Sequence, residues 1–402
     1  MDSADTPLSV CNVVKNCSLP FPGAFLDFLE ENGLDPSMYA MIESVPRYIR
    51  VKPGCESHLL EMEDELKCKL QKITWLPGFF SIPPQIQIAG SKAYQQGKIY
   101  GMDAASGAAV LALNVSLGDH VLDLCAAPGA KLCMLADLLG SSGSLTGVDI
   151  ARHRLAACRT MLHKYFVGDR CRLFVADGAS FSLLPFRSCV ETKPNPCMTG
   201  KNDPEIFAEW TGKRSWGDRK KAKARSSAAT NQIQSSQPEL IFYGRHSGVV
   251  GLCKNDIYNA VDEPSTSGYD RVLVDAECTH DGSLKHIQKF ENWGWETLER
   301  RVLDAKRTDS LLHLQLQLLT NGFRLLRVGG TLVYSTCSLT VAQNEDVVKQ
   351  FLSANYSAEL QEVEVAANWP CRSGGIPKTL RFDPKTSGTS GLFIAKFTKL
   401  AS

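Results

Sequence analysis

Short apolar runs and longer amphipathic stretches alternate along most of the chain from about residue 119 onward. Each apolar run ends in polar or small residues, as a buried strand does, and the stretches between the runs repeat apolar residues with helical spacing. The predicted strands are 121–125, 144–150, 172–178, 271–277, 329–337 and 391–397, and the predicted helices are 131–140, 151–166, 309–326 and 343–352. This alternation predicts an α/β fold with a mostly parallel, doubly wound sheet.

The pattern before this region is different. Residues 23–33 form an amphipathic segment that ends at a glycine, and a predicted strand (46–54), helix (56–73) and strand (75–83) follow. We therefore predict an N-terminal domain over residues 1–90, helical at first and then a small α+β unit. The main domain is expected over residues 91–402.

One segment, at about 186–268, interrupts the alternation. It is rich in Ser, Asn, Gln, Pro and charged residues, so we expect a disordered insertion. Its basic residues have two interpretations: a solvated linker, or an arm that attracts nucleic acid or acts as a weak nuclear signal. These residues are Lys213, Arg214, Arg219, Lys220, Lys221, Lys223 and Arg225.

Composition excludes several classes of protein. The net charge is +1, so any nucleic-acid surface must be local. No apolar stretch reaches the roughly 18 residues of a membrane span, and the N-terminal residues do not resemble a secretory signal. We expect an intracellular protein, nuclear or cytoplasmic, without a membrane partner. The 14 cysteines include no CxxC pair, so we expect no metal site. In an intracellular protein we expect their thiols to be reduced.

Three successive predicted strands end in an acid: Asp123, Asp149 and Asp177. In a doubly wound sheet, an acid after the second strand can accept hydrogen bonds from both ribose hydroxyls, and the third can accept one from an adenine amine. The turn after the first strand contains one glycine and no GxGxxG, which disfavours a dinucleotide. S-adenosylmethionine has no phosphates and suits this turn better. Any single acid could instead be a helix cap.

A second group of candidates lies at the ends of two later strands: Asp275 and Cys278 after one, Cys337 after the other. A thiolate that adds to carbon-6 of a cytosine makes carbon-5 nucleophilic, so that it can accept a methyl group. One cysteine would attack and the other would assist release, while the acid would hydrogen-bond the ring. Strand capping without chemistry is a reasonable alternative for Cys278 alone.

Several ordered motifs resemble the Sun-domain (Nol/Nop/Sun) family of S-adenosylmethionine-dependent RNA cytosine-5 methyltransferases. DLCAAPGAK, from Asp123, resembles the family's DxCAAPGGK, and RVLVDAECT, from Arg271, resembles VLxDAPCS. GGTLVYSTCSLTVAQNEDVV, from Gly329, resembles GGxLVYSTCSxxxxENExVV, and the resemblance covers about residues 95–397 outside the insertion. It implies a Rossmann-like methyltransferase sheet over residues 91–402, preceded by an RNA-binding unit.

The resemblance also implies roles for individual residues. Cys337 would be the nucleophile, Cys278 would assist product release, and Asp275 would contact the target cytosine. The cofactor would be held by residues of the turn and of the strand ends: Cys125, Ala126, Ala127, Pro128, Gly129, Ala130, Lys131, Asp149, Arg154, Asp177 and Asp275. The target base would be flipped out of structured RNA. Transfer RNA is favoured slightly over ribosomal RNA as the partner, because no acidic or basic tail of nucleolar type is present.

Two residues depart from the family pattern. Glu277 replaces the proline before Cys278, and a carboxylate at that point is expected to raise the pKa of the neighbouring thiol. Met102 stands where a glutamine is usual. An active enzyme is favoured. The alternatives are a catalytically silent protein that binds S-adenosylmethionine and RNA, and a methyltransferase that acts on protein or a small molecule.

Overall fold

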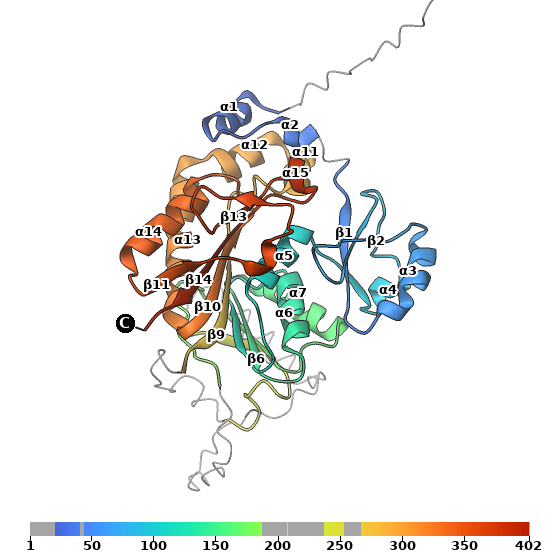
Figure 1. Cartoon of the computed structure of the whole chain (residues 1–402), viewed down its shortest axis with the longest axis vertical. Helices are drawn as coiled ribbons and strands as arrows, with labels where there is room; N and C mark the ends of the chain where they lie inside the picture. The colour runs from blue at the N-terminus through green and yellow to red at the C-terminus, as the bar shows by residue number, and fades with distance from the viewer. Residues whose placement is uncertain (1–20, 41–43, 187–206, 208–236, 253–266, 402) are drawn as a thin grey trace, which may run out of the picture.

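The computed structural model describes residues 21–40, 44–186, 207, 237–252 and 267–401. A central sheet contains ten strands of these residues, in the order β12-β13-β14-β10-β9-β5-β6-β7-β8, with β11 paired to β14 (Figure 1). The five parallel strands are β5 (His120–Asp123), β6 (Ser144–Asp149), β7 (Cys171–Val175), β9 (Tyr269–Asp275) and β10 (Leu326–Thr336). The antiparallel strands are β8 (Glu239–Tyr243), β11 (Ala358–Gln361), β12 (Arg372–Ser373), β13 (Leu380–Phe382) and β14 (Leu392–Lys399).

The strand order changes direction at β5. The chain continues from β5 to β6 and β7 on one side, whereas β9 and β10 lie on the other side. In open α/β sheets a crevice forms at the carboxyl ends of the strands on either side of such a reversal, and ligands bind there. The fold therefore predicts a site between the ends of β5 and β9.

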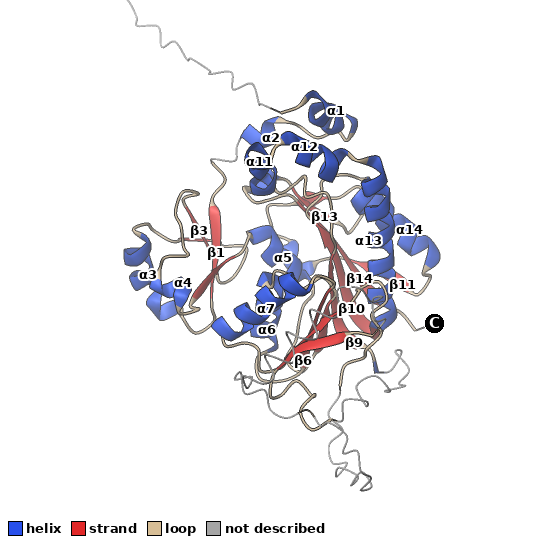
Figure 2. Ribbon diagram, turned by 180° about the vertical axis from the view of Figure 1, so that it is seen from behind, coloured by secondary structure: helices blue, strands red, loops and turns tan. Residues whose placement is uncertain are grey.

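Helices cover both faces of the sheet (Figures 1 and 2). The helices α5 (Ala104–Ala112), α6 (Ala130–Leu139) and α7 (Arg152–Lys164) lie on one face, and α13 (Ala305–Leu325) and α14 (Val347–Ala354) lie on the other. Side chains of β9 alternate between these layers: Leu273 packs with α5, α6 and α7, whereas Val272 and Val274 pack with α13 and α14. Both faces of each central strand are thus buried, which explains why these strands read as apolar runs.

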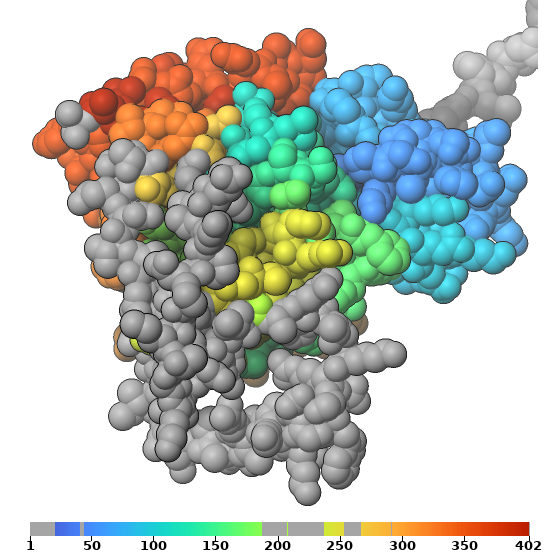
Figure 3. Space-filling view, turned by 90° about the horizontal axis from the view of Figure 1, so that it is seen from below, coloured from blue at the N-terminus to red at the C-terminus, as the bar shows by residue number. Residues whose placement is uncertain are grey.

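A small domain, residues 47–101, packs beside α5, α6 and α7. Its sheet has the order β2-β3-β1-β4 and contains β1 (Arg47–Val51), β2 (Gln71–Lys72), β3 (Phe79–Ile82) and β4 (Ile99–Gly101). Its helices are η1 (Glu56–His58), α3 (Leu59–Leu66) and α4 (Lys92–Gln95). Figure 3 shows the domain as a blue lobe at one side of the molecule. The sheet extends past residue 90, where the sequence analysis ended the N-terminal domain, because β4 pairs with β1.

The small domain is joined to the main domain by a buried ion pair and by close apolar packing. Arg50 of β1 pairs with Asp137 of α6, and both side chains are 5% exposed. Phe79 of β3 packs against α5 at Gly107, where a side chain would collide with its ring. The absence of a side chain at Gly107 therefore lets the small domain approach the main domain closely.

The first helices pack elsewhere. α1 (Gly23–Glu31) and α2 (Ser37–Ala40) contact α11 (Leu284–Trp293), α12 (Trp295–Leu298) and η3 (Glu299–Leu303) through a shared apolar cluster that includes Phe25, Leu29, Ile287 and Phe290. The Tyr39 hydroxyl donates a hydrogen bond to the carbonyl oxygen of Asp281, at 2.8 Å. The remaining short helices are η4 (Ala342–Asp346), η5 (Glu364–Ala366) and α15 (Pro384–Ser387). Residues 21–40 thus pack over the loop that follows β9.

Part of the segment expected to be an insertion belongs to the main sheet. Residues 237–252 are described, and β8 pairs antiparallel with β7. The basic residues between 213 and 225 lie outside the described residues. Among the helices that the structure describes, none is both long and apolar enough to cross a membrane.

The close approach at Gly107 can be tested with Gly107→Ala. The new methyl carbon would lie 2.4 Å from Cζ of Phe79. Overpacking of a core costs about 1–3 kcal/mol, and alanine gains about 1 kcal/mol over glycine in a helix. We expect a net loss of free energy of unfolding in urea denaturation. Gly23→Ala is the control, because a Cβ at residue 23 would have no other atom within 4 Å. Unchanged or raised stability of Gly107→Ala would contradict the packing described.

Candidate functional site

The candidate residues lie at the carboxyl ends of adjacent parallel strands. β9 and β10 pair in parallel, with Asp275 opposite Ser335. Cys278 and Cys337 follow these two residues in loops that leave the same edge of the sheet. The turn after β5 is beside them, because β5 pairs with β9. The fold therefore brings the predicted cofactor turn and the two cysteines to one crevice.

The turn after β5 is fixed by the next strand and helix. A side-chain oxygen of Asp149, at the end of β6, accepts a hydrogen bond from the backbone amide of Ala127 at 3.2 Å. Arg154 of α7 donates to the carbonyl oxygen of Ala127 at 3.0 Å. Gly129 precedes α6 with φ 110°, and a Cβ there would lie 3.1 Å from Cα of Cys158. The turn thus needs its glycine for both conformation and space.

The strand-end acids differ in their environments. Asp123 is buried, and its Oδ2 has no hydrogen-bond partner among the described residues. Burial, together with repulsion from the Asp275 carboxylate, raises the pKa of Asp123 to about 7. Asp177 is exposed and accepts a hydrogen bond from the amide of Ala179 at 2.9 Å. An unpartnered buried carboxylate oxygen at the turn fits a cationic ligand with hydrogen-bond donors.

Lys131 connects the cofactor turn with the reacting end. Its Nζ lies 2.7 Å from Oδ2 of Asp275 and 3.3 Å from Oγ of Ser106. The other oxygen of Asp275 accepts a hydrogen bond from the Ser335 hydroxyl at 2.8 Å. Although burial lowers the pKa of Lys131, the Asp275 carboxylate raises it above its usual value. The Asp275 carboxylate is thus held in place by Lys131 of α6 and by Ser335 of β10.

The two cysteines are in contact, and an imidazole contacts both of them. The Sγ atoms of Cys278 and Cys337 are 3.3 Å apart. Nδ1 of His280 lies 2.9 Å from Sγ of Cys337 and 3.7 Å from Sγ of Cys278. Cys278 is buried, whereas Cys337 is partly exposed. Of the two thiols, Cys337 is therefore the more accessible to a ligand in the crevice.

The thiol pair releases one proton easily and retains the other. Burial raises the pKa of Cys278, but the hydrogen bond from Cys337 and the positive charge of His280 bring it well below its usual value. Within the pair, the thiol that keeps its proton has its pKa raised by that hydrogen bond and by burial, and this thiol is Cys337 when Cys278 is the thiolate. Attraction to the Cys278 thiolate raises the pKa of His280. The first proton that is lost therefore belongs to the pair rather than to one sulfur, and the imidazole of His280 contacts both sulfurs.

Glu277 does not have the effect expected from the sequence. Its side chain forms an ion pair with Arg307 of α13 at 3.1 Å, and the pKa of the neighbouring Cys278 is lowered rather than raised. The expectation was wrong because it considered only the preceding residue. His280, two residues after the cysteine, supplies the dominant nearby charge.

Buried hydrogen bonds connect the loops that carry the two cysteines. The side chain of Gln343 donates to the Thr279 hydroxyl at 2.8 Å and accepts from the Thr279 amide at 3.1 Å. Oδ2 of Asp281 accepts a hydrogen bond from the amide of Leu339 at 2.7 Å. Asp281 of the Cys278 loop therefore satisfies a backbone amide of the Cys337 loop, and Gln343 of η4 satisfies one of the Cys278 loop. This coupling fixes the separation of the two sulfur atoms.

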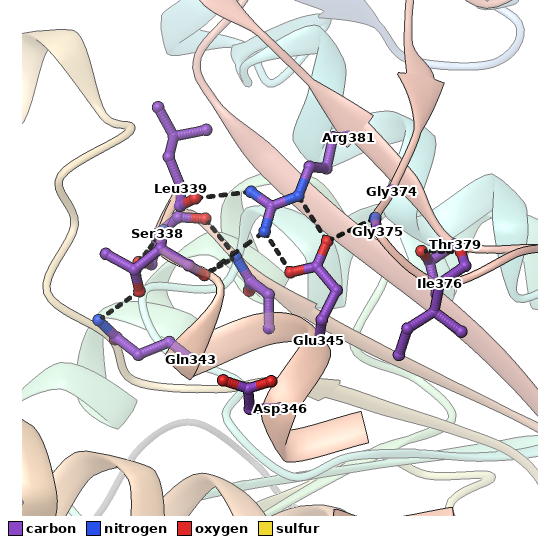
Figure 4. Close-up of polar contacts among 12 residues, drawn as sticks. Ser338, Leu339, Gln343, Glu345, Asp346, Gly374, Gly375, Ile376, Thr379 and Arg381 are labelled. Atoms are coloured by element: carbon purple, nitrogen blue, oxygen red, sulfur yellow. Dashed lines mark hydrogen bonds and ion pairs between the residues drawn. The ribbon is translucent and has the colours of Figure 1, made fainter. Parts of the chain in front are cut away.

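A buried ion pair between β13 and η4 stabilises the loop after Cys337 (Figure 4). Nε of Arg381, on β13, donates to the Glu345 carboxylate at 2.7 Å, and a second nitrogen also pairs with this carboxylate. A third nitrogen of Arg381 donates to the carbonyl oxygen of Leu339 at 2.7 Å. The backbone amide of Gly375 also donates a hydrogen bond to Oε1 of Glu345, at 2.9 Å. Arg381 thus ties the loop to the sheet.

Sequence analysis missed His280, Ser106 and Ser335 as site residues. His280 was recognisable as a titratable residue two positions after Cys278. Its contact with Cys337 was not, because it depends on a left-handed backbone at φ 59°. Met102 lies buried in the core cluster that contains α5.

Cys278, His280 and Cys337 place their donor atoms within 4.8 Å of one another, and no fourth described His, Cys, Asp or Glu joins them. A structural zinc site has four protein ligands, so this group does not match one.

Comparison with known proteins assigns the family. Residues 110–185 and 234–398, more than half of the chain, match the family described as 16S rRNA methyltransferase RsmB/F. These ranges contain the cofactor turn and both cysteine loops. The chain belongs to the RsmB/F methyltransferase family. The family resemblance noted from the sequence is thereby confirmed.

Curated relatives of this chain have names that refer to RNA. It is 29% identical over 265 residues to the 5-cytosine rRNA methyltransferase NSUN4 of Bos taurus, covering 65% of this chain and 47% of that protein. It is 26% identical over 277 residues to the multisite-specific tRNA:(cytosine-C(5))-methyltransferase trm4b of Schizosaccharomyces pombe, covering 69% of this chain and 32% of that protein. The chain thus spans from about a third to about half of the length of these relatives.

Solved structures of similar shape confirm the α/β fold class. NSun6 from Pyrococcus horikoshii with SFG has a TM-score of 0.62 at 16% identity, covering 95% of this chain and 99% of that one. A methyltransferase homolog from Pyrococcus horikoshii has a TM-score of 0.57 at 21% identity, covering 94% of this chain and 100% of that one. The doubly wound sheet predicted from the sequence is therefore confirmed as the fold of this chain.

Glu345→Gln tests whether the ion pair with Arg381 supports the Cys337 loop. The substitution leaves Arg381 buried beside a neutral amide, and breaking a buried ion pair costs about 3–5 kcal/mol. We expect a loss of this size in urea denaturation. The control is Asp346→Asn, because its ion pair with Lys349 is exposed and such pairs are worth about 0–1 kcal/mol. Equal effects of the two substitutions would show that the Arg381 pair does not support the fold.

Asp123→Asn tests the electrostatic cost of the strand-end acid. Because folding raises the pKa of Asp123 from 3.8 to about 7, folding favours the protonated acid, and this stabilisation is lost as the pH rises through 7. The variant should be more stable than the wild type at pH 8 by up to about 4 kcal/mol, and the gain should be about 2–3 kcal/mol smaller at pH 5. Urea denaturation at both pH values measures this difference in the free energy of unfolding between the variant and the wild type.

The control for removing one carboxylate is Asp177→Asn, since Asp177 is exposed. It should not show the same dependence of the stability change on pH. A gain for Asp123→Asn that is equal at both pH values would contradict the raised pKa.

Proposed function

We propose that this chain is an RNA cytosine-5 methyltransferase that uses S-adenosylmethionine and forms a covalent adduct through Cys337. One observation supports this proposal above the others. A partly exposed thiol and a buried thiol lie 3.3 Å apart at the ends of adjacent strands, beside a fixed carboxylate and a cofactor-type turn. A methyltransferase for proteins or small molecules has no need of two such thiols.

The crevice fits the proposed cofactor. S-adenosylmethionine carries a positive charge on its sulfur atom and another on its amino group, and it supplies the methyl group when bound. The buried Asp123 carboxylate offers an unpartnered oxygen, and Asp149 and Asp177 follow the next two strands. Burial of anions at this turn disfavours a phosphate-bearing ligand and favours a cation. Cys125 to Lys131, Asp149, Arg154, Asp177 and Asp275 are the residues that we assign to this ligand.

The reacting residues have distinct proposed roles. The sulfur of Cys337 attacks carbon-6 of the target cytosine, which makes carbon-5 nucleophilic. Asp275, held by Lys131 and Ser335, faces the same end of the crevice and would hydrogen-bond the ring. The buried Cys278 would assist removal of the proton from carbon-5 and release of the product. Because Glu277 pairs with Arg307 on α13, its carboxylate gives no reason to favour a silent protein.

The proposed substrate is RNA. Relatives named for transfer RNA and for ribosomal RNA both match the chain, so the comparisons support the broader class. We keep transfer RNA as the favoured substrate, with the small domain (residues 47–101) as an RNA-contacting unit. An RNA substrate implies an intracellular protein, nuclear or cytoplasmic. Bisulfite sequencing of cellular RNA with and without the gene would name the target cytosine.

The two cysteines should give opposite results when substituted. Cys337→Ala should abolish transfer of a radiolabelled methyl group to RNA while leaving S-adenosylmethionine binding unchanged, because the attacking sulfur is lost. Cys278→Ala should accumulate protein bound covalently to RNA, because addition occurs and release fails. A slowly migrating band on a denaturing gel detects the adduct.

Cys371→Ala is the matched control, since this half-buried cysteine lies in the segment before β12. It should behave as the wild type in both assays. Turnover retained by Cys337→Ala would overturn the assignment of the nucleophile. Absence of an adduct with Cys278→Ala, while the wild type is active, would overturn the role in release.

A further inference from the structure

His280 is the titratable side chain closest to the reacting sulfur, and the proposed mechanism so far leaves it without a role. Its Nδ1 lies 2.9 Å from Sγ of Cys337, shorter than the distance between the two sulfurs. A neutral imidazole can accept a proton at this atom, and an imidazolium can hold a thiolate as an ion pair. Paired thiol and imidazole groups at this distance are the usual arrangement of an activated cysteine.

The backbone at His280 is a second, independent observation. Its φ is 59°, in the left-handed region that is uncommon for residues other than glycine, although asparagine, aspartate and histidine adopt it more often than the rest. Such a conformation costs on the order of 1 kcal/mol or more and persists where the surroundings enforce it, often at functional sites. Here the neighbouring Thr279 and Asp281 are buried and hydrogen-bonded to the Cys337 loop or to η4. The strained backbone directs the imidazole toward the thiols.

The ring of His280 is also held from the side of α11. It packs against the ring of His286, with centroids 4.8 Å apart. Burial, together with the charges of His280, Lys289 and Arg301, lowers the pKa of His286 to about 4. His286 is therefore neutral near pH 7 and serves as an uncharged packing partner. The other charged or titratable groups that act on His280 are Asp275, Glu277, Cys278 and Cys337, and Asp281 is the next residue in the chain.

We propose that His280 is a catalytic residue that activates Cys337 by taking up its proton at Nδ1. This inference deepens the proposed function and depends on it for the identity of the nucleophile. In the step, the S–H bond of Cys337 breaks, the proton forms an N–H bond at Nδ1, and the electron pair stays on sulfur. That pair then forms the bond to carbon-6, while the carbon-5 to carbon-6 double-bond pair moves to carbon-5. When the adduct breaks down, the pair returns to sulfur beside the imidazolium.

The test measures the thiolate without RNA. Alkylation of Cys337 by iodoacetamide is followed from pH 5.5 to 9.5 (roughly the span of ordinary and activated thiols) by peptide mass spectrometry, with a chelator present. The wild type should react rapidly near pH 6.5, where an ordinary thiol is protonated. His280→Gly and His280→Asn should react at least about tenfold more slowly there and recover at high pH, because a shift of one pKa unit changes the thiolate fraction about tenfold.

Both variants suit the left-handed backbone, so they should fold, and circular dichroism verifies this. His280→Gly also leaves a space, and free imidazole should restore part of the alkylation rate and of the methyl transfer. A residue that only supports the loop would not be rescued in this way. His313→Asn, which changes an exposed histidine of α13, is the matched control and should resemble the wild type.

The outcomes separate this inference from the proposed function. Alkylation profiles of the folded His280 variants that coincide with the wild type would overturn the role of His280, even if the enzyme methylates RNA. A shifted profile with imidazole rescue, in a protein that transfers no methyl group to RNA, would support the activation of Cys337 and overturn the proposed substrate. Slower alkylation that free imidazole does not restore would also overturn the proposal.

Discussion

The parallel pairing of β9 with β10 is the constraint on which the site depends. It sets Asp275 opposite Ser335, so the two following loops leave the sheet side by side and bring their sulfurs within 3.3 Å. Pairing of β9 with β5 adds the cofactor turn on the other side. A shift of one residue in either pairing would turn Asp275 to the opposite face of the sheet. The buried core on both faces of these strands therefore fixes the chemistry as well as the fold.

Charge is concentrated in this crevice at a cost in stability. Asp123 and Asp275 repel each other, and burial disfavours the ionised form of Asp123. Lys131 offsets part of this repulsion through its ion pair with Asp275. Away from the crevice, the Arg381 and Glu345 ion pair and the Gln343 hydrogen bonds stabilise the loop that carries Cys337. No buried side-chain atom of Arg381, Glu345 or Gln343 lacks a hydrogen-bond partner, whereas Asp123 retains an unpartnered oxygen. That difference is typical of a site arranged to receive a ligand.

The alternating pattern predicted the central strands and their helices because both faces of those strands are buried and each helix has one apolar face. It missed β8, which lies within a polar segment and pairs only at the sheet edge. It also missed β11, β12 and β13, which are short and gain their order from pairing with one another and with β14. The candidate cysteines and acids were predictable as strand-end residues. The contact of His280 with Cys337 was not, because it depends on backbone conformation and on a loop 57 positions away.

The most direct test of this account is to identify the residue that bonds to the base. RNA that carries 5-fluorocytidine in place of cytidine traps the adduct, because fluorine at carbon-5 cannot leave as a proton does. After incubation with S-adenosylmethionine and protease digestion, mass spectrometry identifies the peptide that carries the nucleotide. The account predicts the adduct on Cys337. An adduct on Cys278, or transfer of methyl groups to natural RNA without any trapped adduct, would contradict it.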